Sequence, residues 1–311
     1  MEKEMQPQTN PRKRKIKKGR AFLFFLFLIV VFSGIGYGGW KGYQSYHSPW
    51  GEKIPDSFSR LPDSEFSKQF LNILIVGVGD EEEGRRLPDT FLVLSIDRRD
   101  HQFTFVLIPP DIVLKEKKTE FKTLRDIYLL EGKEETLLTI EQLLQVPVQH
   151  YLTFRADTLP YVIDALGGIE VYVEKDLNYS DSLMNPPLEI HLKKGMQRLN
   201  GDQISQFLRF QSDELGELGR LKRQQLFLKS FHEQTGKLSI MARSPWVINS
   251  LVGRVETDMS MNDFVDIFWH IWLGKVQTEI YPIKLEKKRW IPSHDSWQER
   301  ASKLFPVIIK P

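Results

Sequence analysis

The chain has 311 residues, a formal net charge of +2 and no cysteine. This length allows one large domain or two small ones with appendages, and the small net charge indicates no general affinity for nucleic acid. The absence of cysteine excludes a disulfide framework, a thiolate zinc site and a cysteine nucleophile.

The N-terminus carries a basic cluster followed directly by an uncharged apolar stretch. Seven lysines and arginines lie between residues 12 and 20, and residues 21–40 contain no charged side chain. At about 1.5 Å per residue, a helix of this length spans about 30 Å, the thickness of a bilayer hydrocarbon core. We therefore predict a basic cytoplasmic tail at 1–20 and an uncleaved transmembrane anchor at 21–40. A cleavable signal peptide is the alternative, since it has the same order of basic and apolar residues.

Because basic residues are retained inside, everything after the anchor is expected to face the outside of the cytoplasmic membrane. The protein is thus predicted to be single-pass, with its N-terminus inside. Residues 41–69 contain several prolines and serines and are predicted to form an extracytoplasmic stalk.

Regular structure is predicted after the stalk. Apolar runs predict strands at 72–80, 91–97, 103–110, 148–154, 169–175 and 278–284. Periodic patterns predict helices at 123–130, 134–144, 157–166, 200–208, 217–235, 238–251 and 260–271. Strands interleaved with helices are typical of an α/β fold. We expect one domain at 70–285, with a mainly buried central sheet flanked by helices, and a C-terminal tail at 286–311.

The loop after the first predicted strand contains carboxylates and arginines. Loops at strand ends are frequent ligand sites in α/β domains, and Mg²⁺ prefers oxygen ligands. Asp80 and Asp89 are therefore candidate metal ligands, and Arg85 and Arg86 lie in the same segment. A polar surface loop is the alternative, although Asp89 abuts a buried strand, where a free carboxylate requires an explanation. Asp111 follows two prolines at the end of the third strand, where simple chain termination is the alternative.

The segment from Arg209 to Gln225 passes from a loop into a helix and is rich in charge. Arg220 and Arg223 are three residues apart and share a helix face. The planar guanidinium group binds phosphate oxygens two at a time, and nearby carboxylates can hold arginines in position or ligate a hard cation. The pattern suits a pyrophosphate–metal site, although a charged, solvated helix face would have the same composition.

Other motifs that carry chemistry are absent from the sequence. The seven histidines have no HExxH or similar ligand spacing, and there is no GxSxG elbow, P-loop or GxGxxG. GVGD at 77–80 lacks the third glycine and the lysine of a nucleotide-binding loop, so it is a weak signal.

Taken in order, several blocks of the chain resemble the LytR–CpsA–Psr family. The blocks are NILIVGVGD, DTFLVLSID, FTFVLIPPD, TIEQLLQVPVQHYLTF, VIDALGGIEVYV, LNGDQISQFLRF and GRLKRQQ. The resemblance implies a transferase that moves a glycopolymer from a polyprenyl-pyrophosphate carrier to peptidoglycan or another envelope acceptor. It also implies a bound Mg²⁺, arginines that hold the pyrophosphate, and an aspartate that acts as a base.

The resemblance assigns these roles to specific residues. Asp89 and Asp111 are implied as catalytic aspartates, together with Arg220. The implied pyrophosphate contacts are Arg86, Arg209, Arg220, Arg223 and Gln224. Asp80 and Asp89 would hold the metal. Asp213 and Glu217 are implied as supporting acids, with Glu217 at a position where the family has aspartate.

Three arginines of the family pattern are missing. Leu87, Pro110 and Gln211 occupy their positions, with Arg86 adjacent to the first and Arg155 as another substitute. Each lost guanidinium removes charge-assisted contacts of about 1.5–3 kcal/mol. A surviving Mg²⁺-dependent transferase is therefore one hypothesis. The alternative is a catalytically weak or silent relative that binds polyprenyl carriers or organises envelope assembly. An exported domain cannot reach DNA, so a transcriptional regulator is disfavoured.

Overall fold

The computed structural model describes residues 68–82, 85–117, 120–182, 188–211, 215–235, 254–260, 263, 264, 267, 270 and 274–305. The predicted tail, anchor and almost all of the predicted stalk lie outside these residues, as does the helix expected at 238–251. No helix within the described ranges is both long and apolar enough to cross a membrane.

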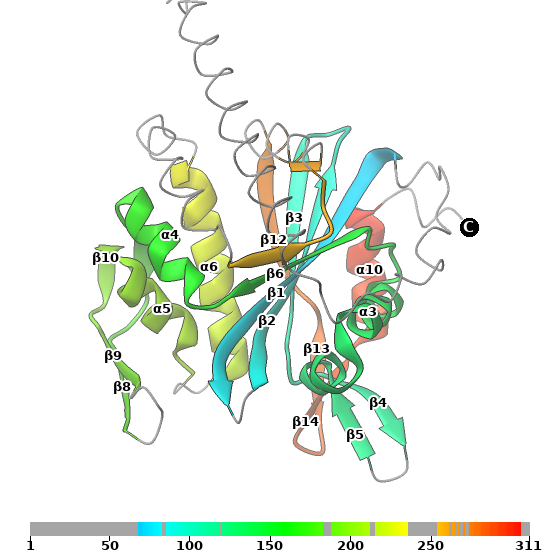
Figure 1. Ribbon diagram of the computed structural model, residues 1–311, viewed down its shortest axis with the longest axis horizontal. Helices are drawn as coiled ribbons and strands as arrows, with labels where there is room; N and C mark the ends of the chain where they lie inside the picture. Colours follow the sequence, from blue (N-terminus) through cyan, green and yellow to red (C-terminus); the bar gives the residue numbers. More distant parts are fainter. Residues whose placement is uncertain are drawn as a thin grey trace, which may run out of the picture. The chain divides into compact units, whose positions relative to one another are not determined.

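The domain is built around a mixed six-stranded sheet (Figure 1). In spatial order its strands are β11 (Val255–Thr257), β6 (His150–Arg155), β1 (Phe70–Glu82), β2 (Arg85–Asp97), β3 (Gln102–Ile108) and β12 (Lys275–Ile280). Strands β1, β2 and β3 are antiparallel to one another, whereas β6 and β12 run parallel to their inner neighbours β1 and β3. Strands β2 and β3, which match the strands predicted at 91–97 and 103–110, pair as an antiparallel hairpin.

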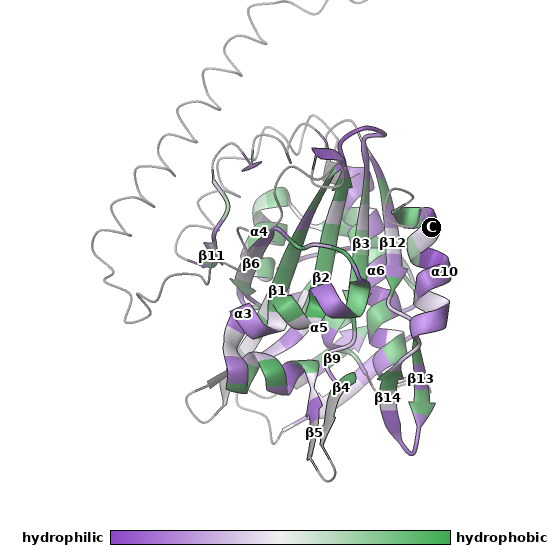
Figure 2. Ribbon diagram, turned by 90° about the vertical axis from the view of Figure 1, so that its right-hand side faces the viewer, coloured by the Kyte–Doolittle hydropathy of each residue, from purple (hydrophilic) through white to green (hydrophobic). Residues whose placement is uncertain are grey.

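Both faces of the central strands are apolar, which explains their nearly continuous hydrophobic sequence. In β1, Leu74 and Val76 point into the largest core cluster, whereas Leu71 and Ile73 contribute to a second cluster. This alternation follows the two-residue period of a strand. Figure 2 shows the same strands as predominantly hydrophobic ribbons between helices with hydrophilic outer surfaces.

One face of the sheet is covered by α3 (Leu124–Leu144) and α10 (His294–Leu304) (Figure 1). Two helices were predicted at 123–130 and 134–144, and the structure joins them across a kink at Gly132, whose φ of 88° is accessible to glycine. Trp297 of α10 is buried in the main core, and its indole N–H donates to the carbonyl oxygen of Leu144 over 2.8 Å. Residues after 285, which the sequence separates as a tail, thus include a helix packed on the core.

The other face carries α4 (Thr158–Leu166), α5 (Gly201–Arg209) and α6 (Glu217–Thr235) (Figure 1). These helices surround their own apolar cluster together with two small sheets. The small sheets pair β7 (Ile169–Val173) with β10 (Gly195–Leu199) and β8 (Leu177–Asp181) with β9 (Leu188–Leu192). The strand predicted at 169–175 is therefore real but lies outside the main sheet.

Two further hairpins lie at the end of the sheet where β3 ends. They are β4–β5 (Val113–Lys117 and Glu120–Thr123) and β13–β14 (Ile283–Glu286 and Arg289–Pro292). Both hairpins extend to the same side in Figure 1, and an isolated parallel bridge joins Ile112 to Trp290. The strand predicted at 278–284 is divided between β12 and β13, because the chain leaves the main sheet at Tyr281.

Candidate functional site

Asp89 lies over two glycines of the neighbouring strand β1. A Cβ atom at Gly77 would come within 3.5 Å of Asp89 Oδ1, and one at Gly79 within 3.5 Å of Asp89 Oδ2. The Thr90 hydroxyl donates to Asp89 Oδ1 over 2.9 Å. The GVGD segment thus provides the space in which this partly exposed carboxylate is held.

Arg220, in the first turn of α6, joins that helix to the start of β2. Its Nε donates to Glu217 Oε2 over 2.9 Å, its Nη2 donates to Glu217 Oε1 over 2.5 Å, and its Nη1 donates to the carbonyl oxygen of Asp89 over 2.9 Å. The side chains of Arg220 and Glu217 are only 6% and 9% exposed. All three guanidinium nitrogens are therefore bonded to the protein, and Arg220 fixes the backbone of Asp89.

The charge of Arg220 is maintained despite its burial. Burial lowers the pKa of this guanidinium. The hydrogen bonds to Glu217 and the charges of Asp89 and Asp111 raise it by a larger amount, so the pKa lies above its ordinary value. Arg220 is thus a permanent cation. Its electrostatic interactions place both catalytic candidates, Asp89 and Asp111, in the field of one buried guanidinium.

Gln211 has a structural partner at a position where the resemblance implies arginine. Its Nε2 donates to Glu217 Oε2 over 2.9 Å, the same oxygen that accepts from Arg220 Nε. A neutral amide here completes the hydrogen bonds of a carboxylate that already neutralises one arginine. The missing charge at residue 211 is therefore consistent with the local packing.

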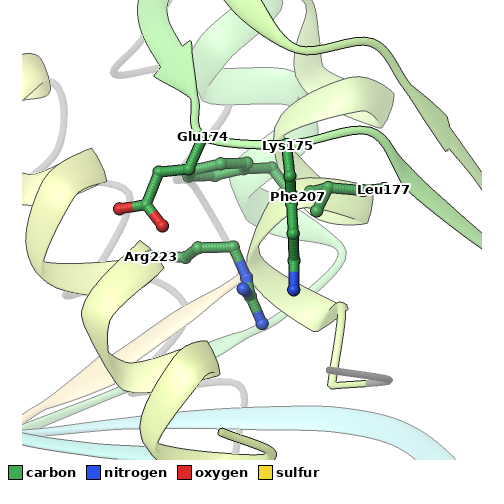
Figure 3. A pocket seen from close by; sticks show the side chains of 5 residues that line it. All are labelled: Glu174, Lys175, Leu177, Phe207 and Arg223. Atoms are coloured by element: carbon green, nitrogen blue, oxygen red, sulfur yellow. The ribbon is translucent and has the colours of Figure 1, made fainter. Parts of the chain in front are cut away.

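Arg223 and Gln224 are buried on α6, at 6% and 8% exposure. Arg223 Nη2 donates to the carbonyl oxygen of Phe210, and its guanidinium lies 5.1 Å from the Phe210 ring centroid. A small, solvent-open hollow beside it is lined by Glu174, Lys175, Leu177, Phe207 and Arg223 (Figure 3). The Lys175 amine and the Arg223 guanidinium extend in a similar direction, which makes one side of the hollow cationic (Figure 3). Arg209 is partly buried in the last turn of α5, where a cation suits the helix dipole.

Asp111 is held by an arginine that the sequence did not single out. Its carboxylate is half exposed, and Oδ1 accepts from Arg125 Nε and Nη2, each over 3.1 Å. The Arg125 backbone N–H donates to the carbonyl oxygen of Pro110, and that of Leu124 to Ile112. The first turn of α3 therefore fixes the loop that carries Asp111.

A sequence signal for Arg125 was present. Thr123 caps α3 in a capping box with Asp126, which places Arg125 at the second helical position. A cation there opposes the helix dipole, so it requires an anionic partner. The pairing with Asp111 depends on how β3 and α3 meet in space, and local sequence does not show that.

Of the remaining candidate residues, some have side chains that the structure describes and others do not. The side chains of Asp80 and Arg86 lie outside the described part of the structure, as does all of Asp213. Arg155, suggested as a substitute cation, pairs with Asp157 next to it in the chain. No cluster of three or more histidines or carboxylates suited to a metal occurs within the described ranges.

Asp89 has the properties of one magnesium ligand. Its carboxylate offers hard oxygen ligands, it is partly exposed, and only Oδ1 accepts a hydrogen bond from Thr90. A side chain at Gly77 or Gly79 would press against the Asp89 carboxylate, so the two glycines keep its oxygens uncovered on that side. These features of Asp89 fit one carboxylate ligand of Mg²⁺.

The fold and site define an α/β domain with buried arginines and carboxylates at one end of a mixed sheet. A model of the LytR_cpsA_psr family matches residues 48–305, so the chain belongs to this family. The resemblance seen in the sequence is thereby confirmed.

Curated relatives cover most of the chain. It is 29% identical over 265 residues to the polyisoprenyl-teichoic acid–peptidoglycan teichoic acid transferase TagV of Bacillus subtilis (strain 168), covering 80% of this chain and 66% of the relative, about two thirds of its length. It is 24% identical over 275 residues to the enzyme of that type called TagU in Enterococcus faecalis (strain ATCC 700802 / V583), covering 85% and 88%.

Solved structures support the fold. The crystal structure of B. subtilis TagV aligns with a TM-score of 0.64 at 23% identity, covering 78% of this chain and 99% of that one. TagT bound to LI-WTA aligns with a TM-score of 0.60 at 17% identity, covering 79% and 93%. At these identities the structural likeness establishes the fold.

Proposed function

We propose that this chain is a membrane-anchored, extracytoplasmic transferase that moves a glycopolymer from a polyprenyl-pyrophosphate carrier to a cell-wall acceptor. The observation that carries the proposal is the buried guanidinium of Arg220, which bonds to the backbone of Asp89 and interacts electrostatically with Asp89 and Asp111, in a chain of this family. The names of TagV and TagU, which are teichoic acid transferases, support the type of reaction.

The reaction is a phosphoryl transfer with balanced bonds. A hydroxyl oxygen of the acceptor attacks the phosphorus that bears the glycopolymer, and the bond from that phosphorus to the bridging oxygen breaks. Polyprenyl monophosphate leaves, and the hydroxyl proton goes to a carboxylate. We assign this base to Asp111, because Arg125 contacts only its Oδ1 and the carboxylate is half exposed. Asp89 is the second candidate base.

Cations supply most of the catalysis in such a reaction, because charge stabilisation and positioning dominate phosphoryl transfer. Asp89 with Asp80 would hold Mg²⁺, which would supply positive charge to offset that of the donor diphosphate. Arg220 holds the backbone of Asp89 in place through its hydrogen bond to the Asp89 carbonyl oxygen. Arg209, Arg223 and Gln224, with Arg86 in β2, are the proposed contacts of the donor diphosphate.

The proposal is tested by measuring release of polyprenyl monophosphate by the full chain in membranes or detergent. We expect release that requires both a polyprenyl-diphosphate glycan donor and Mg²⁺. Asp111→Asn should abolish most of it, and wild-type protein without any release would contradict the proposal.

A catalytically weak or silent carrier-binding protein is the second candidate. The burial of Arg220 and Arg223, together with Pro110 and Gln211 at arginine positions, favours it. Under the transferase proposal, Pro110→Arg combined with Gln211→Arg raises turnover, since added guanidinium groups stabilise transition-state charge. Retained lipid binding with no turnover in either protein would establish the silent function instead.

A further inference from the structure

We propose that the β13–β14 hairpin binds the polymer part of the donor through successive phosphate groups of a phosphate-bearing glycopolymer. This inference rests on the proposed function, because it takes the donor diphosphate to lie at the Asp89–Asp111 end of the sheet. It adds a second binding surface outside that site. No residue of the hairpin was a candidate in the sequence.

The hairpin tip has an unusual backbone for its residues. Glu286 pairs with Arg289, which leaves Lys287 and Lys288 as a two-residue turn with φ values of 48° and 64°. A turn with two positive φ values is of the type that prefers Asn-Gly, because those residues tolerate the left-handed region. Two lysines are strained there, and strain kept at an exposed position indicates a function for the side chains.

The charge of the hairpin is strongly positive. Both turn lysines are exposed, and neither has an ion-pair partner within the described part of the chain. The acid of the hairpin, Glu286, lies 2.8 Å from Lys284 and is neutralised by it. Arg289 adds a further exposed cation at the base of the turn. The tip appears in Figure 2 as a hydrophilic end on a projecting ribbon.

The hairpin is attached directly beside the candidate base. Trp290 of β14 forms a bridge with Ile112, the residue after Asp111. In Figure 1 the hairpin projects from the end of the sheet where β3 ends. Asp111 follows β3 by three residues in the chain. A polymer that leaves the diphosphate towards solvent on this side passes the hairpin.

The faces of the hairpin suit a chain of alternating sugars and phosphates. Leu285 and Trp290 are direct cross-strand partners and therefore share one face, where Leu285 is 60% exposed and Trp290 is partly exposed. Sugar rings pack on such apolar and aromatic surface by their C–H faces. The lysine ammonium groups are flexible, hydrated point charges, which suit repeated phosphates without a fixed register.

A second two-lysine turn shows what a structural lysine pair looks like in this fold. Lys193 and Lys194 lie in the turn between β9 and β10, where Asp176 accepts from Lys193 Nζ over 3.0 Å and from the Lys194 backbone N–H over 2.7 Å. That pair has a carboxylate partner, in contrast to the tip of β13–β14. It provides a matched control of equal charge.

The test replaces the tip with the residues that its backbone prefers. The double variant Lys287→Asn with Lys288→Gly removes two charges and relieves the positive-φ strain, so it should fold at least as stably as wild type. We expect its affinity for a soluble poly(glycerol phosphate), measured with the full-length protein at low salt, to fall about tenfold. The difference should shrink at about 0.5 M salt, where exposed charges are screened.

The controls separate this surface from its neighbours. The variant Lys193→Ser with Lys194→Ser should bind the polymer like wild type, and soluble peptidoglycan fragments should bind equally to all three proteins. Unchanged polymer affinity in the tip variant, an equal loss in the control pair, or a loss confined to peptidoglycan fragments would overturn the inference.

Turnover distinguishes this inference from the proposed function. On a donor with a single sugar unit, the tip variant should turn over like wild type, whereas on a long phosphate-bearing donor its KM should rise. Absence of turnover in wild type would contradict the transferase proposal alone, because the polymer-binding difference is measured without any reaction.

Discussion

Arg220 Nη1 donates to the backbone carbonyl of Asp89, so the first turn of α6 is joined to the first residues of β2 across the end of the sheet. The same guanidinium is bound on its other side by Glu217. An arginine expected at the ligand is thus part of the structure that positions a carboxylate.

Replacing Arg220 should therefore cost stability as well as function. In Arg220→Ala, Glu217 keeps a charge that is almost inaccessible to water, at 9% exposure, and loses its partner. We expect a loss of about 3–5 kcal/mol in the free energy of unfolding, the range for breaking one side of a buried ion pair. Denaturant unfolding measures it. Arg220→Ala combined with Glu217→Ala should be destabilised by less than the sum of the single variants.

Arg125→Ala should lower activity with little loss of stability. Its side chain is 27% exposed and its partner Asp111 is 50% exposed, so the ion pair itself contributes little to folding. Without it the proposed base loses its orientation. We expect kcat/KM for donor to fall about 10- to 100-fold, as for the loss of a charge-assisted contact.

Arg300 offers a matched control for this measurement. It forms a similar partly exposed pair with Glu279 over 3.2 Å, on α10. Arg300→Ala should leave kcat/KM unchanged. An equal fall in both variants would mean that Arg125 has no specific role in the site.

Asp89→Asn should reduce turnover by about 100-fold or more, because an amide is a weaker ligand for a hard cation and carries no charge. The backbone contact with Arg220 uses the carbonyl oxygen and is retained. The variant should therefore unfold at the wild-type temperature. Polyprenyl monophosphate release is measured with and without EDTA, and wild-type release that is indifferent to EDTA would exclude the metal.

A histidine on β6 predicts a pH dependence of stability. Asp258 lies 3.4 Å from His150, and this contact raises the pKa of the imidazole despite its burial. The distance is that of an ion pair rather than a well-formed hydrogen bond. Because the folded-state pKa is above the unfolded value of about 6.5, the stabilisation is present below that pH and is lost as pH rises through the folded pKa.

Thermal unfolding between about pH 5.5 and 8.5 tests the contribution of His150. Wild type should lose on the order of 1 kcal/mol relative to His150→Gln as the pH rises, since the glutamine carries no titrating charge. Parallel curves for the two proteins would show that the Asp258 contact has no energetic effect.

Long periodic segments of the fold were predictable, because their faces are set by local burial. The helix at 217–235 and the central strands β1, β2 and β3 follow the sequence pattern closely. The partner of β7 was not predictable, since pairing with β10 rather than with the main sheet depends on residues far apart in the chain. The break between the helices predicted at 123–130 and 134–144 agrees with the non-helical backbone of Gly132.

The candidate site was predictable in part for the same reason. Asp89, Asp111 and the α6 segment were found from residue type and position, and the electrostatics of Arg220 involve both aspartates. Whether an arginine faces a ligand or is buried against Glu217 depends on packing. Arg125 was missed because its partner comes from another element.

The rings of Phe70 and Phe305 meet edge to face, with their centroids 5.6 Å apart. Phe70 begins the first strand, and Phe305 follows the last helix, so the two ends of the described domain complete the same core. A chain made from its N-terminus cannot close this core until Phe305 has been synthesised, more than 230 residues after Phe70. Removal of α10 and Phe305 should therefore open the core that Phe70 begins.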